Sequence, residues 1–211
     1  PVAVKVLSAM LAADPAYVER FRREARLIAN LRHPNVVHIY AFGEHQGLLY
    51  MVQELLPGVT LERRIDDLNH AGQGMARDEV LAIVADLAAA LDAAHAVGVI
   101  HRDVKPGNAI ANAQGRMVLT DFGIARSTVD ATQTATGILL GTPGYVAPEQ
   151  AVSNTGVTAA CDIYGLGVVT FELLTGRRPF EGDTPTAIVL KHLYDAPPAP
   201  SMLRPGLPPT L

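Results

Sequence analysis

The sequence changes its pattern once, near residues 54–58, and this change constrains the fold more than any other feature. Before it, runs rich in β-branched residues alternate with polar turns around one amphipathic helix, a pattern that favours strands. After it, helical periodicity predominates. We therefore expect an α+β fold of two lobes, a small strand-rich lobe at residues 1–54 and a larger, mainly helical lobe at residues 55–211. A cleft suited to a ligand is expected where the lobes meet.

The segments behind this pattern can be placed along the chain. Asp14 followed by Pro15 is typical of a helix start, and Gly98 of a helix end. Six prolines between Pro197 and Pro209 argue against regular structure there. We expect strands at 2–7, 36–42, 48–53, 108–112 and 117–120, and helices at 14–31, 78–97 and 158–174.

Composition excludes several classes of protein. The chain of 211 residues is 49% hydrophobic and 18% charged, which suits a packed core rather than a disordered chain. Its net charge of −4 argues against a broad nucleic-acid or membrane-binding face. The single cysteine, Cys161, allows no internal disulfide. The longest apolar run, at 163–174, contains two glycines and Glu172, so it does not favour a membrane span. We expect a soluble, cytoplasmic segment without nucleic-acid or membrane contact.

One carboxylate lies in an apolar helix face. At about 100° per residue, the apolar side chains of helix 14–31 gather on one face, and Glu24 falls between Phe21 and Ile28 in angle. A buried carboxylate needs a cation or hydrogen bonds, and Lys5 on the first strand is a candidate partner. The alternative is that Glu24 lies at the edge of the face and is solvated.

Three motifs follow in order. Residues 101–108 read H-R-D-V-K-P-G-N after a long helix and before a short strand, residues 121–123 read D-F-G, and residues 147–149 read A-P-E. Together with Lys5 and Glu24, these blocks resemble the protein kinase family, in particular its bacterial receptor-type Ser/Thr kinases. The resemblance covers essentially the whole chain and implies an ATP-dependent phosphoryl-transfer enzyme with Mg²⁺ (or Mn²⁺) as the cofactor metal.

The resemblance implies a role for each reacting side chain. Lys5 would hold the ATP phosphates and be oriented by Glu24, and Asp103 would accept the proton of the substrate hydroxyl. Lys105 would neutralise the γ-phosphate. Asn108 and Asp121 would ligate the metal, since a hard cation prefers oxygen donors. The alternative is that Asp103 and Asn108 only cap the loop and that Asp121 only forms a turn.

Further residues are implied in supporting roles. Thr142 would bind Asp103 and Lys105 and so position the substrate, a feature of Ser/Thr rather than Tyr kinases. His101 would pack with Phe122 in a structural column that includes Ile28 and Ile39. Asp162 would accept backbone N–H groups of the 101–108 run, and Glu149 would pair with an arginine beyond residue 211.

The resemblance also implies an adenine site at residues 53–56. The backbone of Glu54 and Leu56 would bind the base between the apolar side chains of Ala3 and Ile110. Gln53 would line the back wall of the pocket, and no function is inferred from it.

A threonine-rich run suggests regulation. Thr132, Thr134 and Thr136 fall in a segment where family members autophosphorylate, and Arg102 is a cation on which a phosphate could dock. Threonine-rich loops also occur without phosphorylation. The resemblance further suggests a kinase–kinase dimer for this reaction, and a distal transmembrane anchor in the full-length protein.

The sequence lacks parts that the family carries. Two strands and a Gly-rich loop are expected before the first strand, and final helices after residue 211. Three interpretations therefore stay open. The chain is part of an active Ser/Thr kinase acting on proteins, a catalytically impaired nucleotide-binding or scaffolding fragment, or a kinase-like phosphotransferase for small molecules. The D-F-G and A-P-E motifs argue against the third.

Overall fold

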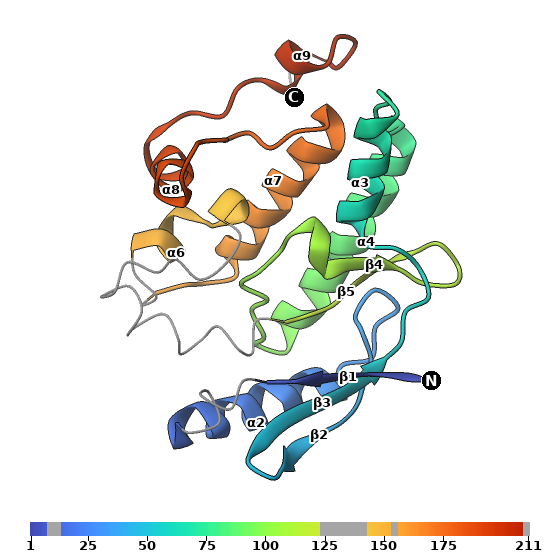
Figure 1. The fold of residues 1–211 in the computed structure, drawn as a ribbon, viewed down its shortest axis with the longest axis vertical. Coiled ribbons are helices and arrows are strands. Elements are labelled where there is room, and N and C mark those ends of the chain that lie inside the picture. Colours follow the sequence, from blue (N-terminus) through green and yellow to red (C-terminus); the bar gives the residue numbers. More distant parts are fainter. Residues whose placement is uncertain (8–13, 123–142, 153–155, 209–211) are drawn as a thin grey trace.

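The computed structural model describes residues 1–7, 14–122, 143–152 and 156–208. Its first part is an antiparallel sheet in the order β1-β3-β2, formed by β1 (Val2–Val6), β3 (Leu48–Glu54) and β2 (Ile39–His45). Lys5 lies opposite Met51 in this sheet. The sheet and helix α2 (Pro15–Asn30) form the lower part of the molecule in Figure 1. The predicted strands at 2–7 and 48–53 are confirmed to within one residue.

The predicted strand at 36–42 is displaced toward higher residue numbers. Strand β2 begins only at Ile39, because the residues before it pair with another part of the chain. The Val37 amide donates to the Leu119 carbonyl at 3.0 Å, and Val36 forms a parallel bridge with Leu119. The β-branched pattern was recognised correctly, but it does not specify the partner strand.

Helix α2 (Pro15–Asn30) packs against the sheet and matches the prediction closely. The Asp14 side chain accepts from the Ala16 amide at 2.9 Å, and Pro15 occupies the first turn, where its missing N–H has no cost. The helix buries one face, including Tyr17, which the pattern analysis did not include. The buried side chains are Tyr17, Phe21, Ala25 and Ile28.

Helices predominate after Glu54. The predicted helices at 78–97 and 158–174 are confirmed as α4 (Arg77–Ala96) and α7 (Ala160–Thr175), which contact each other. Helices α3 and α8 were not predicted. The expectation of no regular structure at 197–209 is wrong, because Pro200 begins a short helix and proline is tolerated in a first turn. The remaining elements are α3 (Leu61–His70), α6 (Pro148–Val152), α8 (Pro185–Tyr194), α9 (Pro200–Leu203), and the 3-10 turns η1 (Pro106–Asn108) and η3 (Pro143–Tyr145).

A short hairpin lies between the sheet-rich part and the helices. It consists of β4 (Ala109–Ala111) and β5 (Met117–Leu119), and it lies between the lower sheet and α7 in Figure 1. The segment that follows β3 passes so close to β4 that a Cβ on Gly58 would lie 2.3 Å from the Ala111 carbonyl oxygen. Glycine is therefore required there for the connection between the two parts.

No helix within the described residues has both the length and the apolar character needed to cross a membrane.

Candidate functional site

A buried carboxylate anchors the 101–108 run. Asp162, in the first turn of α7, is 1% exposed. Its Oδ2 accepts from the His101 amide at 2.8 Å, and its Oδ1 accepts from the Arg102 amide at 2.7 Å. The His95 Nε2 lies 2.7 Å from Oδ2. The geometry is the one expected for Asp162. The contribution of His95 was missed, although a histidine in the last turn of an alanine-rich helix is a signal for it.

His101 links this run to the D-F-G segment. Its Nδ1 accepts from the Asp103 amide at 3.2 Å, while its Nε2 donates to the Thr120 carbonyl at 2.9 Å. This pattern requires the neutral ring, and burial lowers the His101 pKa, which favours the same form. The ring centroid lies 4.7 Å from that of Phe122. The predicted contact between His101 and Phe122 is present.

Two donors orient the carboxylate of Asp103. The Asn108 Nδ2 donates to Asp103 Oδ2 at 3.0 Å and to the Asp103 carbonyl at 2.8 Å. The Lys105 Nζ lies 2.9 Å from the same Oδ2. All three side chains are at least partly buried, which strengthens these charge-assisted bonds. The sequence motif therefore brings Asp103, Lys105 and Asn108 together.

Asp121 is held next to this group by Thr120. The Thr120 amide donates to the Asn108 carbonyl at 2.8 Å, and its hydroxyl donates to the same oxygen at 3.1 Å. Asp121 has φ +57°, and Arg102 has φ +64°. Non-glycine residues in this region are strained by about 1–3 kcal/mol and cluster at functional sites. Backbone strain thus occurs at the residue before Asp103 and at Asp121 itself.

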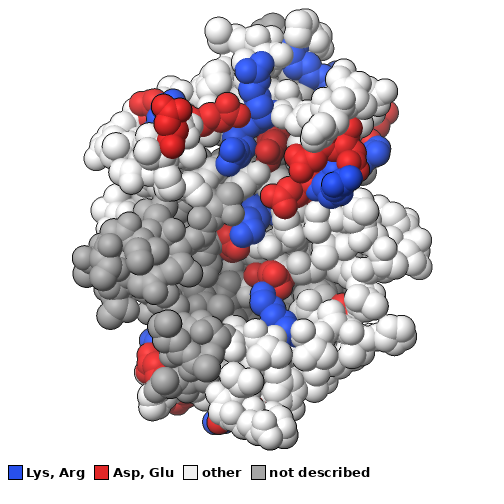
Figure 2. Space-filling view, in the orientation of Figure 1, with Lys and Arg blue, Asp and Glu red and all other residues white. Residues whose placement is uncertain are grey.

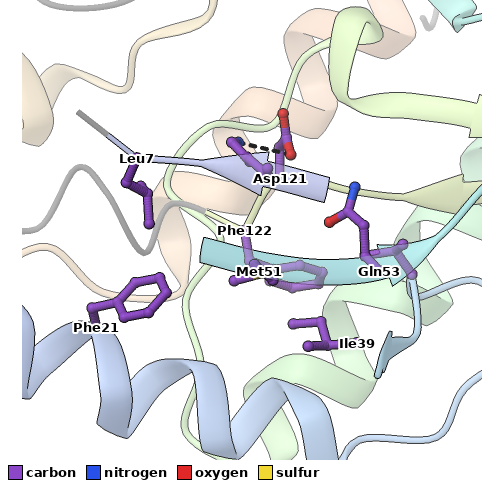
Figure 3. Close-up of a pocket in the computed structure, with 9 residues that line it drawn as sticks. Leu7, Phe21, Ile39, Met51, Gln53, Asp121 and Phe122 are labelled. Carbon is purple, nitrogen blue, oxygen red and sulfur yellow. Dashed lines mark ion pairs between the residues drawn. The ribbon is translucent and has the colours of Figure 1, made fainter. Parts of the chain in front are cut away.

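Lys5 reaches the site from β1. Its Nζ lies 2.8 Å from the Asp121 Oδ1, the ion pair drawn as a dashed line in Figure 3. Both side chains are about two-fifths exposed (43% and 38%), so solvent screens the pair. In Figure 2, acidic and basic side chains adjoin one another along a hollow of this face.

The expected ion pair between Lys5 and Glu24 is not formed in this structure. Lys5 meets Asp121 instead, and Glu24 has no ion pair with another described residue. Glu24 is half-buried, and this desolvation raises its pKa, while the positive charges of Arg102, Arg23 and Arg20 partly oppose the shift. Of the two interpretations of Glu24, its inward placement fits better than full solvation, but its role in orienting Lys5 stays a prediction.

A small cavity lies behind Lys5. It has a volume of about 30 Å³, and Figure 3 shows Phe122, Met51 and Ile39 around it. Gln53 also lines this cavity, and its expected place on the back wall of a base-binding pocket stays a prediction. Ala3 lies opposite Gln53 in the sheet. The full lining is Lys5, Leu7, Phe21, Val37, Ile39, Met51, Gln53, Asp121 and Phe122.

The 53–56 segment continues from the cavity to the helices. The Glu54 amide donates to the His38 carbonyl at 2.8 Å, so its N–H is already used. Its carbonyl is therefore the group that Glu54 can offer to a base. Leu56 and Ile110 are half-buried. Their predicted contact with a base stays a prediction.

The donor set at Asn108 and Asp121 suits a hard divalent ion. The amide nitrogen of Asn108 is used on Asp103, which leaves its oxygen as the atom that can face a metal. Within the described residues, no group of three or more His, Cys, Asp or Glu side chains forms a metal site. Mg²⁺ needs few protein ligands when substrate phosphates and water complete its coordination, so the two side chains fit it.

Other predicted residues stand apart from this cluster. Glu149 lies half-buried in the first turn of α6. Thr132, Thr134, Thr136 and Thr142 lie outside the described residues. Sequence reasoning missed Gln150, whose amide bonds to the backbone of Arg102 at 2.9 Å. No helix was expected at residues 148–152, and a glutamine in its first turn would in any case have signalled a cap and not this longer-range contact.

Comparison with known proteins gives a consistent result. The family model for the protein kinase domain matches residues 1–200. Among curated relatives, the probable serine/threonine-protein kinase pknA2 of Bifidobacterium longum is 40% identical over all of this chain and 28% of its own length. The serine/threonine-protein kinase PknA of Mycobacterium tuberculosis is 41% identical over all of this chain and 48% of its length. The chain thus spans between about a quarter and a half of these relatives.

Solved structures agree with the fold. The crystal structure of the Mycobacterium tuberculosis PknI kinase domain is 31% identical, with a TM-score of 0.75. The match covers 98% of this chain and 72% of the solved one. The predicted two-lobed α+β fold class is confirmed.

Proposed function

Because this chain belongs to the protein kinase domain family, we propose that it is the catalytic core of a Ser/Thr protein kinase, which transfers the γ-phosphate of ATP to Ser and Thr hydroxyls of proteins. The observation that carries the proposal is the Asp103 carboxylate, which Asn108 and Lys105 hold within 3.0 Å. This group lies next to Asp121, which Lys5 contacts from β1. We propose residues 1–54 as part of the N-lobe and residues 55–211 as most of the C-lobe.

Asp103 acts as the base in this proposal. It accepts the hydroxyl proton while the hydroxyl oxygen forms a bond to the γ-phosphorus and the bond from that phosphorus to the β-phosphate oxygen breaks. The phosphoryl group ends as a phosphate ester on the protein substrate, and ADP is the leaving group. Lys105, 2.9 Å from Asp103, offsets the negative charge that develops on the transferred group. Bound ATP and Mg²⁺ (or Mn²⁺) supply the phosphoryl group and the neutralising charge.

Lys5, Asp121 and Asn108 bind the nucleotide and metal in this proposal. With nucleotide and metal bound, Lys5 would hold phosphate oxygens and Asp121 would hold the metal, in place of the ion pair that they form with each other here. Because the pair is exposed to solvent, opening it costs little. The Glu24 carboxylate can then pair with Lys5 and orient it, and the positive charge of Lys5 would offset the cost of burying that carboxylate.

Adenine binds at the 53–56 segment in this proposal. The Glu54 carbonyl and the Leu56 backbone contact the base, with Ala3 on one face and Ile110 on the other. Gln53 closes the back of the site, beside the cavity behind Lys5. The half-buried state of Ala3 and Ile110 supports this, since an apolar base needs surfaces that are still accessible.

We propose regulation by autophosphorylation at Thr132, Thr134 or Thr136, between two copies of the kinase. Mapping phosphates after incubation with ATP tests this, and phosphate found only outside residues 127–142 would contradict it. The greater length of the relatives supports a longer protein. In it, this segment would be cytoplasmic and tied to a distal membrane anchor.

The decisive experiment measures phosphate transfer to a generic basic protein by the full-length gene product. The Asp103→Asn variant keeps the size of the side chain but loses the base, so kcat is expected to fall about 10²- to 10⁴-fold. The KM for ATP is expected to change little, because Asp103 does not bind ATP in this mechanism. Equal kcat values for the two proteins would remove the base assignment.

The same assay separates the alternatives. A small-molecule phosphotransferase would label an aminoglycoside panel and not the protein. A scaffolding module would bind nucleotide without labelling either. The protein-kinase proposal expects transfer to the protein alone.

A further inference from the structure

Gln150 connects two segments that are far apart in the sequence. It lies in the first turn of α6, and its Oε1 accepts from the Ala147 amide at 3.1 Å. Its Nε2 donates to the Arg102 carbonyl at 2.9 Å. Both ends of one side-chain amide are therefore used, one on the segment that leads into α6 and the other on the residue before Asp103.

These partners fix which end of the amide is which. The Ala147 amide can only donate, so it must meet the oxygen of Gln150. The Arg102 carbonyl can only accept, so it must meet the nitrogen. A flipped amide would place like groups together at both ends. The orientation of Gln150 thus follows from the backbone groups around it.

The Arg102 carbonyl belongs to the peptide plane that leads into Asp103. The N–H of the same plane, on Asp103, donates to His101 Nδ1 at 3.2 Å. Gln150 holds the opposite side of the plane. The plane before it is held by Asp162, which accepts the Arg102 N–H at 2.7 Å.

Arg102 needs this support because its backbone is strained. Its φ of +64° is disfavoured for a residue with a side chain. Such a conformation persists only where surrounding contacts fix it. If the Arg102 carbonyl were released, the plane could rotate toward a relaxed φ, and the Asp103 carboxylate would rotate with it.

A purely structural role for Gln150 makes a different prediction. Glutamine at the third position of a helix commonly accepts the N–H of the capping residue, and glutamate does so equally well. The bond to Ala147 fits that role. The bond to Arg102 does not, because it requires an N–H donor, which an ionised glutamate lacks.

We propose that Gln150 is a positioning residue for catalysis, which holds the Arg102–Asp103 peptide plane and so aims the Asp103 carboxylate. This inference rests on the proposed function of Asp103. It assigns the start of α6 a direct mechanical connection to the catalytic base, in addition to any role in the packing of the helix.

The test is Gln150→Glu in the full-length gene product. At about pH 8 the ionised glutamate still caps α6, but its second carboxylate oxygen faces the Arg102 carbonyl oxygen, and neither can donate a proton. The kcat is therefore expected to fall about 10- to 100-fold, with little change in the KM for ATP. Protonation restores a donor. The kcat of the variant relative to wild type is therefore expected to rise as the pH is lowered from about 8 to about 5.5.

Two further variants serve as comparisons. Gln150→Met has a similar length but no polar group, so its kcat should be low at every pH in this range. Gln114→Glu makes the same charge change on an exposed turn and should match wild type throughout. If Gln150→Glu equals wild type at about pH 8, or if its loss does not recover on acidification, the proposal is overturned.

Hydrogen exchange gives a readout that is independent of turnover. In Gln150→Glu at neutral pH, exchange is expected to accelerate in the peptide covering residues 99–108, whereas a peptide covering residues 147–152 keeps wild-type protection. Unchanged exchange at 99–108 would contradict the proposal. If wild type transferred no phosphate, the proposed function would fail, and this exchange measurement would still decide whether Gln150 holds the loop.

Discussion

Two carboxylates, Asp162 and Glu24, lie inward on opposite sides of the site, and the structure treats them differently. Asp162 is 1% exposed and receives three donors within 2.8 Å, from His95, His101 and Arg102. Glu24 is half-buried, has no ion pair within the described residues, and has a raised pKa because of desolvation. Buried charge is tolerated where donors surround it and is costly where they do not.

The neighbours of each carboxylate show the same contrast. Around Asp162, His101 uses both ring nitrogens. On α2, the Tyr17 hydroxyl is buried with no hydrogen-bond partner in the described part of the chain, and burial raises its pKa to about 12. The loop that carries Asp103 is therefore held in one geometry, whereas α2 carries polar groups that a different position could satisfy. We infer that the loop is preorganised and that α2 is the element free to adjust.

The largest effect on stability is expected from removing the hydrogen bonds that Asp162 accepts. Asp162→Asn keeps the shape of the side chain but turns an N–H₂ group toward buried N–H donors, so the free energy of unfolding should fall by about 3–5 kcal/mol. Urea denaturation measures this. Asp183→Asn, on an exposed residue, is the control and should change little. A loss below about 1 kcal/mol for Asp162→Asn would mean that the anchor is not a main source of stability.

The next largest effect on stability is expected at Asn35, which joins the segment after α2 to the β4–β5 hairpin. Asn35 is fully buried, donates from Nδ2 to the Met117 carbonyl at 2.7 Å and accepts from Arg116 at 3.0 Å. Asn35→Ala removes the side-chain donor to the buried Met117 carbonyl, while Arg116 keeps Asp86 as a partner, so the free energy of unfolding should fall by about 2 kcal/mol.

The free energies of unfolding of two single variants, Asn35→Ala and Asn30→Ala, are measured by urea denaturation and compared. Asn30 is exposed at the end of α2, and its replacement should be nearly neutral. Equal stability of the two variants would show that the junction is not fixed by Asn35, and that the contrast between the two sides does not depend on it.

The effect at Glu24 has the opposite sign. A raised pKa means that the ionised carboxylate lowers stability at neutral pH, so Glu24→Gln should raise the free energy of unfolding by about 1 kcal/mol. As the pH falls through the raised pKa, wild type becomes protonated and the advantage shrinks. It should be gone below the ordinary value of 4.5.

The same variant should lose turnover if Glu24 orients Lys5 during catalysis. Melting temperatures across pH, together with phosphate transfer, test both parts. Glu19→Gln, on the exposed face of the same helix, is the control for the loss of charge. Destabilisation by Glu24→Gln at neutral pH would contradict the proposed cost of its burial.

This contrast also explains what the sequence could and could not predict. The cluster of Asp103, Lys105 and Asn108 was predictable because all three lie within six residues of one loop, whose geometry is local. The burial of Asp162 was predictable from an acid in an apolar helix. The partner of Lys5 was not predictable, because the sequence allows either Asp121 or Glu24 to face it. Only the position of α2 in the structure decides between them.

Other errors have a similar origin. Strand β2 begins three residues late because Val36 and Val37 pair with Leu119, a choice between partners that local pattern does not contain. The bond from Gln150 to Arg102 spans 48 residues. Local signals therefore predicted the elements and the motif residues, whereas contacts between elements required the structure.

The smallest effect on stability is expected where the effect on function is large. The ion pair between Lys5 and Asp121 is 43% and 38% exposed, so Lys5→Met should change the free energy of unfolding by no more than about 0.5 kcal/mol. Turnover should nevertheless fall about 10²- to 10³-fold, since the variant lacks the cation that we propose binds phosphate. Arg22→Met breaks a pair of similar exposure with Glu44 and should affect neither quantity. If Lys5→Met were strongly destabilising, the Lys5–Asp121 ion pair would be a structural anchor, as Asp162 is. A small change in stability with a large loss of turnover would instead mean that the contacts of Asp162 maintain the fold, whereas Lys5 on β1 responds to the nucleotide.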